Sequence, residues 1–356
     1  MTKFKAVTFV RSRQIGWIAF GGTIGPIIRT FGMDRPWTEI HLVMDGAGRP
    51  RIQGTKGDII MRIFVTGATG FIGSALVPQL IQAGHQVLGL TRSDAGAQAL
   101  RAAGADVKHG NLEDLDSLRD GAAQSDGVIH LAFNHDFSQF QKICDDDRKA
   151  IEAIGEVLLG SNRPFVVTSG TAIAANVDGK PSTEDGPTTS WNPRAASEAA
   201  VKELTTRGVN TSVVRLSQIH DIRKQGLVPY LLAVARQKGV SAYIGDGSIR
   251  WPAAHVSAAA RLYRLAFERA EPGAIYHAVD EQGVSMKAIV EAHGRGLKVP
   301  VVSIKPEEAE AHFGWLAHFA KHDMPASSAL TQQKLNWKPT GPGLIEDLDG
   351  MDYTKA

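Results

Sequence analysis

Glycines with the spacing of a phosphate-binding turn stand near residue 70. The segment 66–73, TGATGFIG, follows the apolar run 63–65 and leads into apolar residues at helical spacing. In a strand–turn–helix unit the first glycine permits the tight turn, the second lets the backbone approach a pyrophosphate, and the third allows close helix packing. The N–H groups that begin the helix then face the anion. The sequence therefore predicts a dinucleotide bound by Gly67, Thr69, Gly70, Phe71, Ile72 and Gly73.

The end of the next apolar run, 86–90, bears on which nicotinamide cofactor is bound. An acidic residue there would bind the ribose 2′-hydroxyl of NAD, but Thr91 and Arg92 occupy the position. A guanidinium suits a 2′-phosphate because its planar fork can make two parallel hydrogen bonds. The alternatives are that Arg92 is a solvated loop residue and that Asp94 reaches the ribose. We predict NADP, with NAD as the second choice.

The elements that must position this turn follow from the hydrophobic pattern. Apolar runs predict strands at 63–65, 86–90, 106–108, 127–132, 165–168 and 211–216. Helical patterns lie between them, including one from 137 to 159 and one that opens at Asn192-Pro193, a cap followed by a first-turn proline. Strands that alternate with helices at this spacing predict an α/β fold with a doubly wound parallel sheet of the Rossmann type and right-handed crossovers.

The order of these pieces resembles the extended or atypical short-chain dehydrogenase/reductase superfamily, which includes NAD-dependent epimerases and dehydratases. The resemblance covers about residues 61–350, and its most specific part is the segment 66–73. It implies that Asn111 and Leu112 line the adenine site and that Leu131 and Ala132 line the nicotinamide-ribose site. It also implies a cofactor domain at 61–218 and a substrate cap at 219–356, from which some segments return to the sheet.

Residues 1–60 precede what reads as the start of the cofactor domain at Met61. This stretch carries basic residues, has no acidic residue before Asp34, and is rich in glycine between Ile15 and Ile28. A targeting segment, an extra domain and translated upstream sequence are the three interpretations. The glycines weaken the amphipathic helix of a targeting segment, and the short length without sustained periodicity argues against an extra domain. We therefore favour upstream sequence and expect an extension that is not part of the fold.

The residue pair that transfers the proton in the superfamily is missing. Family members use a Tyr and a Lys four residues apart on the helix after the fifth strand, where this chain has Arg194 and Glu198. Arginine stays protonated in proteins and cannot exchange a proton near neutrality. One interpretation is that Arg194, Glu198 and Lys202 form ion pairs along one helix face. The other is that Arg194 points into the pocket and holds an anionic or carbonyl group.

Other side chains are therefore candidates for proton transfer. Ser169 and Thr171 follow the fifth strand, where the family places a catalytic hydroxyl, although the usual position matches Gly170. His220 lies just beyond the sixth strand, at the carboxyl edge where sites of open sheets form, and is either a general acid or an exposed loop histidine. Aromatic residues beyond it could line an apolar cavity or pack in a core: Tyr230, Tyr243, Trp251 and the run 313–319.

Composition narrows the class of protein. The fractions of 43% hydrophobic and 21% charged residues are those of an ordinary globular protein, and a net charge of +2 gives no reason to expect nucleic acid. The single cysteine, Cys144, fits a reducing compartment, so we expect a cytoplasmic protein. No apolar run of membrane-spanning length and no metal-ligand spacing is present in the sequence. A homodimer is expected by analogy only.

Two functions are consistent with these features. The first is an NAD(P)(H)-dependent oxidoreductase that transfers hydride to or from a small carbonyl or hydroxyl compound. The second is a non-catalytic NADP(H)-binding protein that senses redox state or regulates a partner. The fold alone cannot separate them, because function depends on the site.

Overall fold

The computed structural model describes residues 60–176, 178–189 and 191–354, together with four strands between residues 13 and 53. It divides into two compact units, Met1–Ile60 and Met61–Ala356. The first unit holds an antiparallel sheet of β1 (Arg13–Phe20), β2 (Thr23–Thr30), β3 (Glu39–Met44) and β4 (Pro50–Gln53) in chain order.

These four strands were not predicted from the sequence. The pairing of β1 with β2 runs from Arg13–Thr30 to Phe20–Thr23. A Gly-Gly dipeptide separates the two runs in the sequence, and such a dipeptide between two strand-like runs is a hairpin signal. Of the residues that suggested a targeting segment, Lys3, Lys5, Arg11 and Asp34 lie outside the described residues. That residues 1–60 are an extension stays a prediction.

The second unit is built on a parallel sheet, which confirms the predicted α/β class. Its order is β14-β10-β9-β8-β5-β6-β7, and every pair of neighbours is parallel. Its strands are β5 (Arg62–Thr66), β6 (Gln86–Thr91), β7 (Asp106–His109), β8 (Gly127–His130), β9 (Phe165–Gly170), β10 (Thr211–Leu216) and β14 (Ile275–Ala278).

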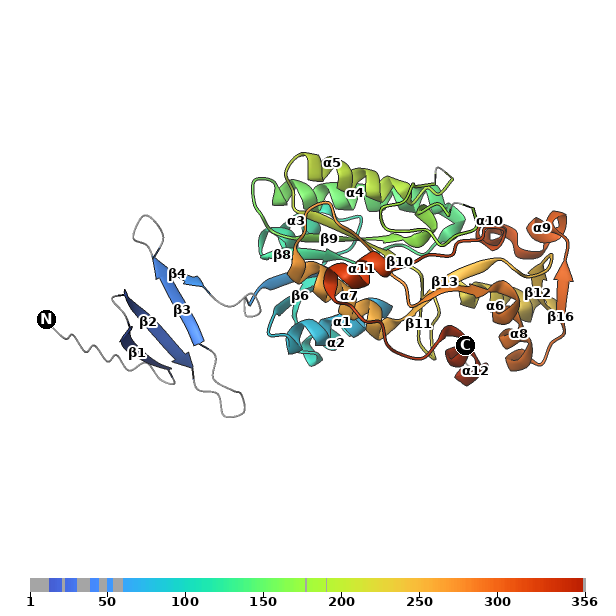
Figure 1. The fold of residues 1–356 in the computed structure, drawn as a ribbon. Coiled ribbons are helices and arrows are strands. Elements are labelled where there is room, and N and C mark those ends of the chain that lie inside the picture. Colours follow the sequence, from blue (N-terminus) through green and yellow to red (C-terminus); the bar gives the residue numbers. More distant parts are fainter. Residues whose placement is uncertain are drawn as a thin grey trace, which may run out of the picture. The chain divides into compact units, whose positions relative to one another are not determined.

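Helices cover both faces of this sheet (Figure 1). One face carries α1 (Phe71–Gln82), α2 (Asp94–Ala102) and α7 (Val256–Arg269), and the other carries α3 (Leu115–Ala123), α4 (Phe140–Leu158) and α5 (Ala195–Thr206). Side chains alternate along a strand, so Ile63 and Val65 of β5 join the core beneath α1 while Phe64 joins the core beneath α4. The two apolar layers hold the carboxyl ends of the strands at one edge.

Two predicted helix starts were early. A short 3-10 turn, η1 (Phe137–Gln139), precedes α4, and α5 begins at Ala195 instead of Asn192. The Asn192 side chain does cap, but it caps a turn: its Oδ1 accepts a hydrogen bond of 3.0 Å from the backbone N–H of Arg194. Arg194 is consequently the N-cap residue of α5.

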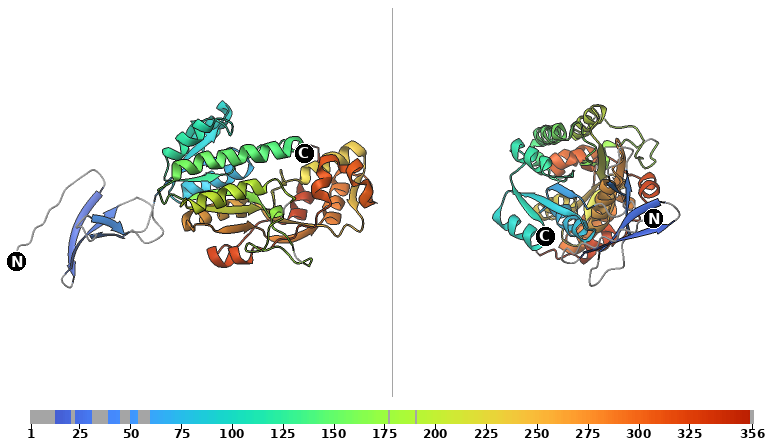
Figure 2. Two further views of the ribbon diagram at one scale, coloured as in Figure 1. Left: turned by 90° about the horizontal axis from the view of Figure 1, so that it is seen from above. Right: turned by 90° about the vertical axis from the view of Figure 1, so that its left-hand side faces the viewer.

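The carboxyl-terminal part forms a smaller lobe at the end of the sheet (Figure 2). Its strands are β11 (Gln218–His220), β13 (Arg250–His255) and β15 (Glu281–Ser285) in one sheet, and β12 (Ser241–Ile244) and β16 (Val301–Ile304) in another. Its helices include α6 (Val228–Lys238), α8 (Met286–Leu297), α9 (Ala309–Phe313), α10 (Ala317–Ala320) and α12 (Leu344–Gly350), with η4 (Gly314–Leu316) before α10. We call this lobe the cap. β14 is instead a strand of the parallel sheet, and α7 and α11 (Ala329–Leu335) lie against that sheet.

Candidate active site

The glycine turn between β5 and α1 leaves no room for side chains at two of its positions. Gly67 has a φ of +66°, and a Cβ there would lie 2.7 Å from the backbone nitrogen of Ala132. A Cβ at Gly73 would lie 2.1 Å from the carbonyl oxygen of Gly67. Thr69 and Gly70, in contrast, are exposed, and Gly70 is the N-cap residue of α1, with no side-chain hydrogen bond to the first N–H groups of the helix. The helix start is therefore open to an anion.

The segments predicted to contact the rest of the cofactor adjoin this turn. The backbone N–H groups of Leu131 and Ala132 donate to the carbonyl and hydroxyl oxygens of Thr66, each at 3.2 Å. Arg92 is exposed at the end of β6. The start of α2, which follows Arg92, lies close to the turn, because a Cβ at Gly96 would lie 3.3 Å from the Thr69 side chain.

Asn111 and Leu112 follow β7, farther along the same sheet edge. Asn111 is exposed and its Oδ1 accepts backbone hydrogen bonds of 2.8 and 3.1 Å from Glu113 and Asp114. Its side-chain oxygen therefore shapes the turn before α3, which leaves the amide nitrogen for a ligand. Leu112 is half-buried beside the core.

Arg194 does not pair along its own helix, so the first interpretation of this residue was wrong. Its Nη1 lies 3.0 Å from Oδ2 of Asp147 in α4, at an angle that makes an ion pair without a hydrogen bond. Its Nη2 donates to the carbonyl oxygen of Thr168 at 2.9 Å. The guanidinium carbon lies 3.8 Å from the centroid of the Phe133 ring. With 8% of the residue exposed, Arg194 is a buried side chain that connects the start of α5 to α4 and β9.

Asp147 is the centre of this buried network. The carboxylate also accepts from Ser197 at 2.7 Å and meets Nε2 of His130 at 3.2 Å. Burial alone would raise the pKa of Asp147, but Arg194, His130 and Ser197 together hold it below its ordinary value. The other ring nitrogen of His130 lies 2.8 Å from the hydroxyl of Thr66, so the network reaches the strand that leads into the glycine turn.

Glu198 is likewise paired across the fold and not with Lys202. Arg215 of β10, 1% exposed, forms two hydrogen bonds with the carboxylate, at 2.8 and 2.7 Å. Parallel bonds from a guanidinium to a carboxylate are among the stronger ion pairs in proteins. Arg194 and Glu198, the residues predicted to stand at the family's proton-transfer positions, are thus both held in ion pairs with buried partners.

The other predicted proton donors are buried. Ser169 is 3% exposed and its hydroxyl has no partner, and the hydroxyl of Thr171 donates to the carbonyl of Leu216 at 3.3 Å. His220 is not a loop histidine: it lies in β11, fully buried, with Nδ1 2.7 Å from Oδ2 of Asp347. Tyr243 is half-buried in the cap, with Lys287 over its ring.

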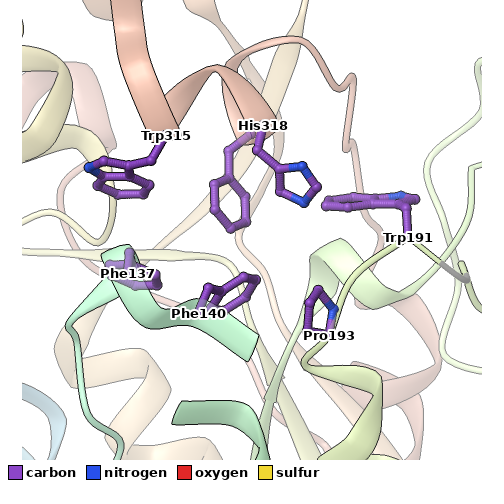
Figure 3. Close-up of a pocket in the computed structure, with 7 residues that line it drawn as sticks. Phe137, Phe140, Trp191, Pro193, Trp315 and His318 are labelled. Carbon is purple, nitrogen blue, oxygen red and sulfur yellow. The ribbon is translucent and has the colours of Figure 1, made fainter. Parts of the chain in front are cut away.

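An aromatic pocket of about 210 Å³ lies beside the start of α5 (Figure 3). Its walls come from the start of α4, the segment before α5, and the η4–α10 region of the cap. The lining residues are Phe137, Phe140, Trp191, Pro193, Trp315, His318 and Phe319. The rings of Phe137 and Trp315 stack at 5.1 Å, so the aromatic run of the cap does form a cavity wall, whereas Phe313 and Trp251 are buried in the cap core.

Successive contacts between aromatic rings connect Arg194 to this pocket. Phe133, beneath the guanidinium, meets His135 edge-on at 5.8 Å, and His135 meets Phe137 edge-on at 6.0 Å. His135 is exposed at the surface, but its ring also packs against Phe133 and Phe137. This partial burial lowers the pKa of His135 below the ordinary value of 6.5, and the charges of Lys224 and Arg194 lower it further. Sequence reasoning missed His135, although an ionisable residue just beyond a strand's carboxyl end was a usable signal.

A second hollow, of about 420 Å³, is lined by Ser248, Ile249, Arg250 and Asp323. Its two charges neutralise each other at 2.6 Å. None of its residues belongs to the glycine turn, to the segment 131–137 or to the start of α5, so we assign it no part in the chemistry.

A model of the NAD dependent epimerase/dehydratase family matches residues 63–279. A protein of Schizosaccharomyces pombe described as uncharacterized is 50% identical over 295 residues, which is 82% of this chain and all of the relative. A 4-hydroxy-2-methyl-3-oxo-4-farnesyl-3,4-dihydroquinoline-1-oxide ketoreductase of Stigmatella aurantiaca is 27% identical over 75% of this chain and 84% of its own.

Among solved structures, a dTDP-glucose 4,6-dehydratase of Streptomyces venezuelae with NAD bound superposes with a TM-score of 0.66. It shares 18% identity and covers 83% of this chain and 97% of its own, so it supports the fold alone. Among the described residues, no helix is both long and apolar enough to cross a membrane. With a match over more than half of its length, on the glycine turn and sheet described above, the chain belongs to the NAD dependent epimerase/dehydratase family.

Proposed function

We propose that this protein is an NADP(H)-dependent reductase of a small, apolar carbonyl compound. The observation that carries the proposal is the continuity between the predicted cofactor site and the aromatic pocket. Segment 131–137 contacts the glycine turn at one end and lines the pocket with Phe137 at the other. A carbonyl held in that pocket would lie at the end of the sheet where a nicotinamide is expected.

The lining of the pocket sets the substrate class. None of its residues is a lysine, arginine, aspartate or glutamate. Burial, and to a lesser degree the charge of His322, lowers the pKa of His318, which favours the neutral form of that ring. A nucleotide sugar carries a diphosphate that requires cationic or N–H partners. About 210 Å³ accommodates one or two rings, which favours a compact aromatic aldehyde or ketone. The ketoreductase relative is named for a 3-oxo group on a dihydroquinoline that also carries a farnesyl chain, which agrees with reduction of an apolar carbonyl compound but not with a compact one.

Arg92 supports NADP over NAD. It is exposed at the end of β6, beside the turn, and no acidic residue stands at that strand end. The 2′-phosphate would take the guanidinium as a charge-assisted partner. Asp94 lies in the first turn of α2, where a carboxylate is stabilised by the helix dipole without any ligand.

His135 is the group that we assign to proton delivery. Of the candidates, Ser169, Thr171 and His220 are buried, and Arg194 is committed to Asp147. The imidazole of His135 is exposed beside Phe137, a pocket residue. When hydride reaches the carbonyl carbon, the oxygen needs one proton, which an imidazolium can give and recover from water.

Stopped-flow measurement of NADPH oxidation tests the function. Compact aromatic aldehydes and ketones should be reduced with kcat/KM values well above those for short aliphatic aldehydes, and UDP-glucose should not be turned over. Trp315→Ala should raise KM for the aromatic substrates about tenfold or more, because it removes one wall of the pocket. Equal rates for aromatic and aliphatic carbonyls, or no change in Trp315→Ala, would contradict the substrate assignment.

His135→Gln should lower kcat for reduction about a hundredfold, which is the usual contribution of one general acid. In the wild type, the fraction of imidazolium falls as pH rises through the lowered pKa of His135. The rate of reduction should therefore fall with rising pH, with a midpoint below 6.5, and the variant should lose this limb. His312→Gln is the matched control, since His312 lies in α9 of the cap against Phe313, does not line the pocket and should leave the pH profile intact.

One observation favours a second function, a non-catalytic NADP(H)-binding protein. Arg194 and Glu198, at the family's proton-transfer positions, are held in buried ion pairs. Such a protein would bind NADPH tightly but oxidise it with none of the carbonyl compounds. The same stopped-flow panel decides between the two functions, provided that NADPH binding is measured in parallel.

A further inference from the structure

A rigid turn follows β11 and presents two basic residues. The carboxylate of Asp221 accepts backbone hydrogen bonds from Arg223 at 2.7 Å and from Lys224 at 2.9 Å, and its own N–H donates to the carbonyl of Lys224 at 2.8 Å. Asp221 is 8% exposed and Gln225 is 2% exposed, so the base of the turn is packed in the protein. The position of the Lys224 backbone is thus fixed before any ligand binds.

The side chain of Lys224 reaches from this turn to the start of α1. Its ammonium lies 5.8 Å from the centroid of the Phe71 ring, and Phe71 is the first residue of α1. The same charge acts on His135, which follows the segment predicted to bind the nicotinamide ribose. Lys224 therefore lies over the start of α1, and its charge also acts on the segment predicted to bind the nicotinamide ribose.

Nothing in the described part of the chain neutralises this charge. Lys224 is exposed, and among the described residues we find no carboxylate within ion-pair distance of its ammonium. Arg223, its neighbour, is paired instead with Asp221 at 3.3 Å. An unpaired ammonium beside the open N-terminus of α1 adds to the positive potential that the helix already provides there.

We propose that Lys224 binds the pyrophosphate of NAD(P)H together with the N–H groups of α1. The inference rests on the cofactor part of the proposed function. In this arrangement the negative pyrophosphate lies between backbone N–H groups and one ammonium, a pairing in which Lys acts as a point charge. The loop from β11 to α6 would then hold the cofactor and the cap together.

Three ligands in equilibrium titrations of the full chain at fixed ionic strength test this contact. NADPH and 2′-phospho-ADP-ribose both carry the pyrophosphate, and adenosine 2′-monophosphate does not. Lys224→Ala should bind the first two about tenfold more weakly and the third within about twofold of the wild type, since one charge-assisted contact is lost. Lys224→Arg should recover most of the affinity.

Lys287→Ala is the matched control. Lys287 also lies over an aromatic ring, 5.9 Å from the centroid of Tyr243, but on α8 of the cap, so none of the three ligands should be affected. Unchanged NADPH affinity in Lys224→Ala would overturn the proposal, as would an equal loss for adenosine 2′-monophosphate. A wild-type protein that binds none of the three ligands would instead refute the cofactor assignment of the proposed function.

Discussion

Replacement of Arg194 by alanine is expected to destabilise the protein by about 3–5 kcal/mol, the usual cost of breaking a buried ion pair on one side. Asp147 is 1% exposed, and its remaining partners, His130 and Ser197, supply hydrogen bonds but no fixed positive charge. Because the pKa of Asp147 is lowered in the folded state, its ionised form contributes stability at neutral pH and loses that contribution in acid. Urea unfolding at pH 7 measures the loss.

Two further variants make this result specific. Lys202 lies at an exposed position on the same helix, so Lys202→Ala should change the free energy of unfolding by less than about 0.5 kcal/mol. The double variant Arg194→Met/Asp147→Asn removes both charges together and should recover much of the loss. A free energy of unfolding for Arg194→Ala within about 1 kcal/mol of the wild type would show that Asp147 does not depend on Arg194.

Gly73→Ala is expected to weaken NADPH binding at least about a hundredfold, which corresponds to about 3 kcal/mol. The added Cβ would lie 2.1 Å from the carbonyl oxygen of Gly67 and 2.8 Å from the backbone of Ala68. Neither contact is with a flexible side chain, so α1 must move away from the turn. The N–H groups at its start then no longer point at the pyrophosphate. Titration of NADPH fluorescence gives the affinity, and circular dichroism shows whether the variant is folded.

Gly170→Ala is the control for the glycine turn. Its Cβ would lie 3.8 Å from the carbonyl oxygen of Leu216, an ordinary contact, so folding and NADPH affinity should stay near those of the wild type. Wild-type affinity in Gly73→Ala would mean that the pyrophosphate does not lie at the start of α1.

The parallel sheet and the glycine turn could be predicted because their signals are local. An apolar strand, three spaced glycines and the start of an apolar helix occupy residues 63–80. The sterics at Gly67 and Gly73 involve only the turn itself and the segment after β8. The strand runs were similarly visible, because strands buried on both faces are continuously apolar.

The partners of Arg194 and Glu198 could not be predicted in this way. Helical periodicity relates a residue only to those three or four positions away, and on that basis Arg194, Glu198 and Lys202 form a charged surface stripe. The actual partners come from other elements, Asp147 from α4 and Arg215 from β10. His220 was misjudged for a similar reason, since its partner Asp347 lies at the far end of the chain.

The two ion pairs of α5 also constrain how this site could change under selection. Each pair joins α5 to a different element, so replacing Arg194 by Tyr or Glu198 by Lys leaves the charge of Asp147 or Arg215 buried and uncompensated. Either substitution made first therefore destabilises the protein. Replacing Asp147 or Arg215 would remove the unpaired charge, but such a replacement is favourable only after its partner has already changed. Laboratory evolution toward a tyrosine-dependent activity should therefore succeed from libraries that vary positions 147 and 194, or 198 and 215, together, and stall in libraries of single substitutions.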